Sequence, residues 1–142
     1  MADDWVEQRF KRYQDRLADE ARKRSLHDKA LASYDALFDK LQQRVDKDVT
    51  TYNRLFGSVQ DCKAVFRRVA EGFEISRNNV TTYVKKNNGT VINVRHQIGD
   101  LPRYDTLEVA VTERDAVGYK HEDKFLSVDE ASEAITGQVL CQ

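Results

Sequence analysis

The chain has 142 residues, enough for one domain with a single buried core. Its 23 basic residues nearly balance its 24 acidic residues, and the formal net charge of -1 excludes a surface built throughout to hold nucleic acid or anionic lipid. Hydrophobic residues make up 40% of the chain, which is too much apolar material for a disordered protein.

Neither export nor membrane insertion is indicated by the sequence. No apolar run approaches the roughly 20 residues that cross a bilayer, and the first ten residues, MADDWVEQRF, lack the regions of a secretory signal. Cys62 and Cys141 are far apart and form no CxxC motif. We therefore expect reduced cysteines and a cytoplasmic location.

The first 56 residues contain neither Gly nor Pro. These residues cost about 1 and 3 kcal/mol inside a helix, so their absence permits a long one. Apolar side chains recur every seven residues along one ladder, interrupted only by Arg24: Phe10, Leu17, Leu31, Phe38, Val45, Tyr52 and Val59. A second ladder, offset by three, holds Tyr13, Tyr34, Leu41 and Leu55 but also Glu20, His27 and Asp48. The pattern predicts an amphipathic helix over 1–56 with coiled-coil character.

The ends of this helix are also marked in the sequence. Asp3 or Asp4 is the expected N-cap, and Asp4 with Glu7 has the spacing of a capping box. The basic run 22–24 followed by Ser25 leaves open a break near Ser25. Gly57 is expected to end the helix in a left-handed conformation.

A second helix is predicted over 58–71. Ser58 and Asp61 fit its N-terminus, Gly72 fits its end, and its core face would carry the apolar residues Val59, Cys62, Val65, Phe66, Val69 and Ala70.

From residue 73 to 126 the pattern changes to the period-two alternation of β-strands. Segments 80–86 and 90–96 form a hairpin, for which a three-residue turn with left-handed Gly89 pairs Val84 with Ile92 and Thr82 with Val94. Further strands are expected at 106–114 and 119–125. A capping box at Ser127 opens a last helix over 127–137. The prediction is one α+β domain over 1–142, with an antiparallel meander of four to five strands.

Candidate chemistry is sparse. His96 ends the inward face of its strand, and His121 and Asp123 are expected on one face of the strand 119–125. Together with Tyr104, these three residues are the predicted ligand-binding set. Histidines at the ends of strands more often only pack against neighbours or form hydrogen bonds. No nucleophile arrangement, phosphate-binding loop or metal motif is present, so no catalytic residue, metal or cofactor is predicted.

The basic clusters of the long helix suggest nucleic acid only weakly. Arg9, Lys11, Arg12 and Arg16 are interleaved with aromatic residues, but Asp15, Asp19 and Glu20 cancel much of their field. A solvent-exposed helix face with ion pairs is the simpler interpretation. The mixture of acidic and basic residues also does not suit a helix that lies on a membrane surface.

The aromatic and aliphatic residues of the long helix must be covered. Fifty helical residues span about 75 Å, more than the width of a domain of this size. We therefore predict a partner-binding surface, most simply for a homodimer, made of Phe10, Tyr13, Leu17, Leu31, Tyr34, Phe38 and Leu41. The alternative is a small-molecule-binding or enzymatic pocket between a curved sheet and the helix.

Overall fold

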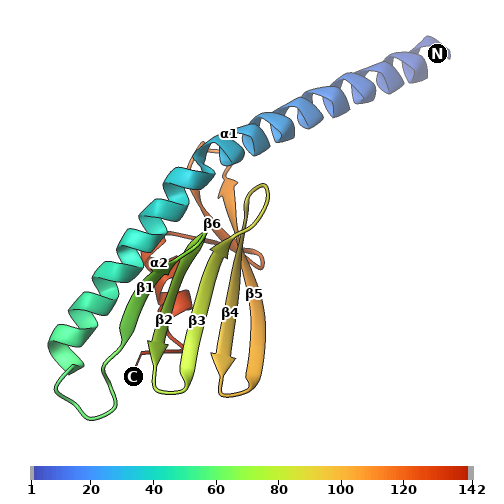
Figure 1. Ribbon diagram of the computed structural model, residues 1–142. Coiled ribbons are helices and arrows are strands. Elements are labelled where there is room, and N and C mark those ends of the chain that lie inside the picture. The colour runs from blue at the N-terminus through green and yellow to red at the C-terminus, as the bar shows by residue number, and fades with distance from the viewer. Residues whose placement is uncertain (1, 141–142) are drawn as a thin grey trace.

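One long helix, a seven-stranded antiparallel sheet and one short helix make up the chain (Figure 1). The computed structural model describes residues 2–140, with side chains from residue 4 onward. The elements are α1 (Ala2–Phe56), β1 (Val65–Val69), β2 (Gly72–Arg77), β3 (Val80–Lys86), β4 (Val91–Ile98), β5 (Leu101–Val111), β6 (Val117–His121), β7 (Lys124–Leu126) and α2 (Val128–Thr136). The predicted α+β class is confirmed, with more strands than the expected four to five.

Helix α1 runs through 55 residues without the break considered near Ser25. It already includes Ala2, so Asp4 lies in its first turn and is not its N-cap, while the side chain of Asp3 lies outside the described part. At the other end Gly57 donates its N–H to the carbonyl of Asn53 at 2.8 Å. Gly57 does not adopt the predicted left-handed conformation.

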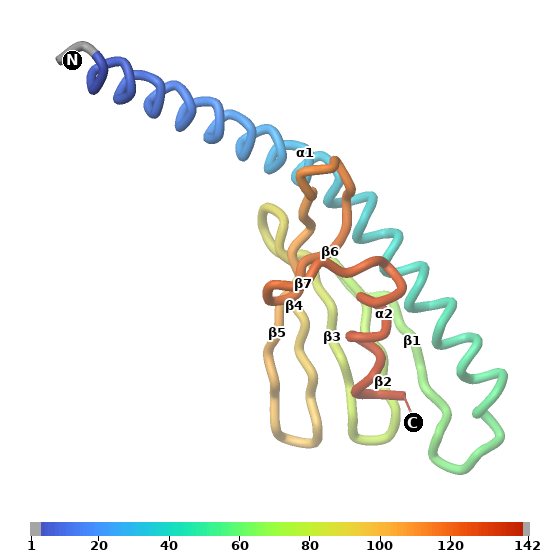
Figure 2. Tube along the Cα trace, turned by 180° about the vertical axis from the view of Figure 1, so that it is seen from behind, coloured from blue at the N-terminus to red at the C-terminus, as the bar shows by residue number. Residues whose placement is uncertain are grey.

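The second half of α1 crosses one face of the sheet, which we call the inner face (Figures 1 and 2). Its buried side chains recur three or four residues apart, the spacing of one face of a helix. They are Ala30, Tyr34, Phe38, Leu41, Val45, Val49 and Tyr52. Phe38 meets the ring of Phe73 on β2 at a centroid distance of 5.9 Å. The Tyr119 hydroxyl, from β6, donates to the carbonyl of Leu37 at 2.6 Å.

Helix α2 lies on the same face and is joined to α1 by polar contacts. Arg44 of α1 pairs with Asp129 at 2.6 Å, and Ser132 donates to Asp48 at 2.6 Å. Ser127 caps α2 with the predicted capping box, completed by Glu130. None of the described helices is long and apolar enough to cross a membrane.

The predicted second helix over 58–71 is wrong. Residues 57–61 form turns, and Val65–Val69 is strand β1, which pairs with β2 along its whole length. Only Phe66 of this strand turns toward the core, where its ring stacks on Phe73 at 5.4 Å, while Val65 is exposed. A short apolar segment fits the spacing of a helix as well as that of a strand. Here a strand forms because β2 has backbone N–H and C=O groups that need hydrogen-bond partners.

The β3–β4 hairpin has the predicted faces but a different register. Val84 pairs with Val94 and Thr82 with His96, two residues from the expected pairing. A shift of two residues keeps every side chain on its face, so Thr82, Val84, Val94 and His96 are all buried as expected. Gly89, at φ 78°, takes the left-handed conformation that the turn requires.

Candidate functional site

The first half of α1 extends beyond the sheet (Figures 1 and 2), and the only ion pair that joins its described residues to the rest of the chain is Arg22 with Glu113, at 3.4 Å. We call residues 4–25 the extension. Every side chain in it is exposed except that of Asp19, which is half-buried. Its large hydrophobic residues are Trp5, Val6, Phe10, Tyr13 and Leu17, with 53% of Trp5 and 58% of Phe10 exposed. Such a row of apolar side chains on one helix normally lies against another surface.

The apolar stripe of the extension lies beyond the sheet, where α1 has changed direction (Figures 1 and 2). Phe10 is four seven-residue steps along the chain from Phe38, which packs on the sheet. A second molecule can cover the extension along this stripe without meeting the sheet of the same chain.

Charges are distributed unequally on the two sides of this stripe. Two rows of period seven flank it: Arg9, Arg16 and Lys23 on one side, and Glu7, Gln14, Ala21 and Asp28 on the other. The guanidinium of Arg16 lies 5.5 Å from the centre of the Tyr13 ring. One flank is therefore basic and the other neutral to acidic, which restricts how two such helices can pair.

The predicted partner surface is divided by the structure. Phe10, Tyr13, Leu17 and Leu31 are exposed. Tyr34, Phe38 and Leu41 instead lie in the core of the single chain, with 7%, 1% and 0% of each residue exposed. These three residues are not accessible to a partner, because the sheet of the same chain already covers them. The second half of the seven-residue ladder is thus buried in the core, and its first half is exposed.

Histidine 96, one of the predicted ligand residues, is buried on the inner face. Its Nδ1 lies 2.8 Å from the hydroxyl of Thr82, directly across on β3. Burial is the largest effect on this side chain and lowers the pKa of His96 below its ordinary value. Asp105 opposes this pKa shift and Arg103 adds to it, so both charged groups lie within electrostatic range.

Histidine 121 is paired with a residue that the sequence pattern did not single out. Its Nε2 lies 2.7 Å from the carboxylate of Asp105 on β5. The predicted partner, Asp123, lies instead in the exposed turn between β6 and β7. Tyr104 points to the opposite face of the sheet from His96, because neighbouring residues of a strand alternate. The predicted set of four is therefore not a single site, and only His96 and His121 share a face.

Metal binding has no support in this region. Among residues 4–140 no group of three or more His, Cys, Asp and Glu side chains is arranged to hold a metal ion. Asp105 contacts one imidazole nitrogen of His121 and leaves the other nitrogen free to exchange a proton. A carboxylate–imidazole pair of this kind is one component of acid–base catalysis. His96 is the third titratable residue on this face, within electrostatic range of Asp105.

The lowered pKa of His96 predicts a dependence of stability on pH. In the unfolded chain His96 takes up a proton near pH 6.5, whereas the folded chain does so only at lower pH. The folded state therefore loses stability as the pH falls from about 7.5 through the ordinary pKa to the lowered one. Urea unfolding between about pH 7.5 and 5 should show a shallower decline for His96→Asn than for the wild type. His27→Asn, at an exposed position of α1, is the control, and equal slopes for the wild type and His96→Asn would contradict the prediction.

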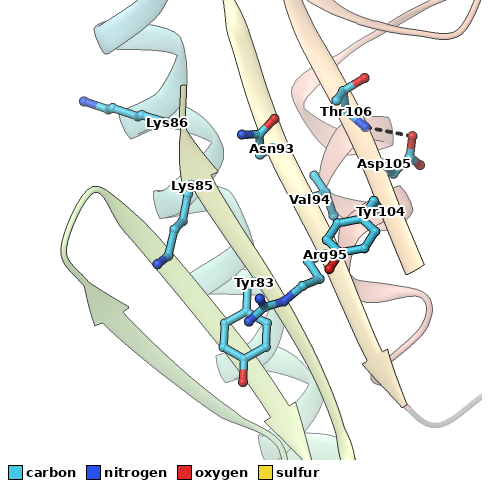
Figure 3. Close-up of a pocket in the computed structure, with 9 residues that line it drawn as sticks. All are labelled: Tyr83, Lys85, Lys86, Asn93, Val94, Arg95, Tyr104, Asp105 and Thr106. Carbon is cyan, nitrogen blue, oxygen red and sulfur yellow. Dashed lines mark hydrogen bonds between the residues drawn. The ribbon is translucent and has the colours of Figure 1, made fainter. Parts of the chain in front are cut away.

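The face of the sheet opposite α1, the outer face, carries an open hollow of about 610 Å³ across β3, β4 and β5 (Figure 3). Alternation along the strands directs six of its lining side chains outward: Tyr83, Lys85, Asn93, Arg95, Tyr104 and Thr106. Among these six residues only Tyr104 was predicted to bind a ligand, and it was expected in a pocket between the sheet and the helix.

Comparison of the chain with protein-family models, curated proteins and solved structures finds no match. The functional proposals therefore rest on the extension, the inner histidines and the outer face.

Proposed function

We propose that this chain is a non-catalytic assembly protein that pairs with a second copy of itself through the extension. The observation that supports it is the exposed stripe of Val6, Phe10, Tyr13 and Leu17, which no residue in the described part of the chain covers. Most of the stability of a helix in a protein comes from packing of its apolar face, and the extension has no such packing among the described residues. Pairing buries the stripe and stabilises the helix at the same time.

A second copy fits this stripe because apolar side chains spaced by seven residues are complementary to themselves. Each helix of a two-stranded coiled coil places such residues between those of its partner. The stripe is interrupted at Glu20 and Arg24, which have opposite charges and are four residues apart. In a parallel pair Glu20 and Arg24 each face their own copy, and Glu20 of one chain also lies next to Arg24 of the other, so these opposite charges offset the two like-charged contacts.

The flanking charges favour the parallel arrangement over the antiparallel one. In a parallel, in-register pair each residue of the basic row faces the partner residue five positions further on in the other row, so Lys23 meets the partner's Asp28. In an antiparallel pair over the same extension the two basic rows face each other. Arg16 would then meet its own copy, and Arg9 would meet the partner's Lys23, giving repulsion along the whole contact.

Cysteine cross-linking tests both the pairing and its direction. Tyr13→Cys places a thiol at the axis of a parallel pair, opposite its own copy, where oxidation should give a disulfide-linked dimer in high yield. Gln8→Cys points away from the stripe and is the matched control. Cys141 is changed to Ser in both variants so that it cannot react. Equal cross-linking of the two variants, or none of Tyr13→Cys, would contradict the parallel pair.

The alternative proposal is a small-molecule-binding or enzymatic domain on the inner face. Its support is the 2.7 Å contact between His121 and Asp105, with His96 nearby on the same face. It is the weaker proposal, because Asp123 and Tyr104, which were expected to complete the site, lie elsewhere.

A further inference from the structure

A row of aromatic and basic side chains crosses the outer face of the sheet. Tyr83 on β3 pairs with Arg95 on β4, and Arg95 pairs with Tyr104 on β5, so the three lie directly side by side (Figure 3). The adjacent row consists of Lys85, Asn93 and Thr106 in the same register. We call these six residues the platform. They line the open hollow on the face that neither α1 nor α2 covers.

Flat groups dominate the first row of the platform. The Arg95 guanidinium lies 4.2 Å from the centre of the Tyr83 ring, which is a stacking distance. Tyr104 is 73% exposed, and Arg95 is exposed as well. Planar side chains in this arrangement are suited to stack against a planar ligand, and every nucleobase has such a face.

The platform itself is also positively charged, because it contains Lys85 and Arg95 and no acidic residue. Within residues 4–140, neither Lys85 nor Arg95 forms an ion pair. Of the acids beside it, Glu74 pairs with Arg67 and Asp105 pairs with His121, while Glu108 accepts a hydrogen bond from Thr90 and keeps its negative charge. An anionic ligand thus meets two unpaired cations.

We propose that the platform binds single-stranded nucleic acid, independently of the pairing of the extension. Bases stack on Tyr104 and on the Arg95–Tyr83 pair, and phosphates contact Lys85 and Arg95. The hollow spans three strands and is open to solvent, so it suits a strand that crosses the sheet better than a single enclosed nucleotide. The near-neutral net charge of the whole chain does not conflict with a local site of this size.

Fluorescence anisotropy with a labelled oligothymidine of about ten nucleotides tests this proposal on the full-length chain. We expect saturable binding at about 50 mM salt that weakens as salt is added, because phosphate contacts release counter-ions. Tyr104→Ala should weaken binding about tenfold through the lost stacking. Arg95→Gln should weaken it and also reduce the salt dependence. Both side chains point to solvent, so the thermal unfolding midpoint should stay near that of the wild type.

The basic face of the extension provides the discriminating control. Arg12→Gln with Arg16→Gln removes two cations from α1 and should leave oligothymidine binding unchanged. Loss of binding in this double variant, together with unchanged binding by Tyr104→Ala, would place the interaction on α1 and overturn the proposal. Absence of wild-type binding at about 100 µM protein would overturn it, as would thymidine monophosphate competing as well as the oligonucleotide.

Discussion

Phe38→Ala should reduce the free energy of unfolding by about 3–5 kcal/mol, a loss large enough to unfold much of a protein of ordinary stability. Phe38 is 1% exposed and lies between α1 and the sheet. Its ring meets that of Phe73 at 5.9 Å and the Lys86 ammonium at 5.1 Å. Removing the ring leaves a cavity in the middle of the core that α1 cannot fill, because it is also held by Tyr34 and Leu41. Urea denaturation followed by circular dichroism measures the loss.

The matched control for this prediction is Phe10→Ala, the same substitution at the same position of the seven-residue ladder. Phe10 is 58% exposed and touches no part of the sheet, so the unfolding of the sheet should change by less than about 1 kcal/mol. Pairing makes stability depend on concentration, so both variants are compared at one low protein concentration. Similar losses for Phe38→Ala and Phe10→Ala would contradict the division of α1 into a core half and an exposed half.

Phe10→Asp combined with Leu17→Asp should convert the self-associated chain into a monomer while leaving its fold intact. In a parallel pair each Asp faces its own copy, so two like-charged contacts replace two apolar ones at the axis. We expect apparent affinity to fall by at least 100-fold, because each pair of buried side chains contributes on the order of 1.5–3 kcal/mol per residue. Sedimentation velocity over a concentration series measures the change.

The control for the double variant carries the same charges on the other side of the helix. Gln8→Asp combined with Ala18→Asp adds two carboxylates that point away from the stripe, and association should persist. If both double variants dissociate equally, net charge and not the stripe governs association. If neither does, the extension is not the interface.

The sequence predicted α1 and α2 well because their signals are local. Missing helix breakers and apolar spacing define α1, and a capping box at Ser127 defines the start of α2. The same local pattern misled at residues 58–71, where Val65 and Phe66 fit a helical face as well as a strand. The strand forms because β2 offers a complete row of backbone partners, which is a property of the tertiary structure.

The number of strands was underestimated because several turns lack the residues that usually mark them. The β1–β2 turn is Ala70-Glu71 and the β6–β7 turn is Glu122-Asp123. Glu71 and Glu122 adopt positive φ values of 64° and 55°, a conformation that Gly or Asn adopts at lower cost. No propensity rule therefore divides 119–125 into two strands, and the error also placed Asp123 beside His121.

The candidate sites depended on pairings between strands that lie outside any one segment of sequence. Asp105 reaches His121 only because β5 and β6 are neighbours, and it preceded the strand expected at 106–114. Tyr83 and Arg95 share the outer face in the expected register as well as in the observed one, since a shift of two residues preserves alternation. Their neighbour Tyr104 joined them only once β5 was found to begin at Leu101, five residues earlier than expected.

The molar mass of the intact chain in solution, measured by size-exclusion chromatography with light scattering, tests the central claim most directly. At micromolar concentration the proposed pair of extensions predicts twice the chain mass of 16.4 kDa, falling toward a single chain on dilution. A mass of 16.4 kDa that stays constant up to high micromolar concentration would contradict self-association through the extension.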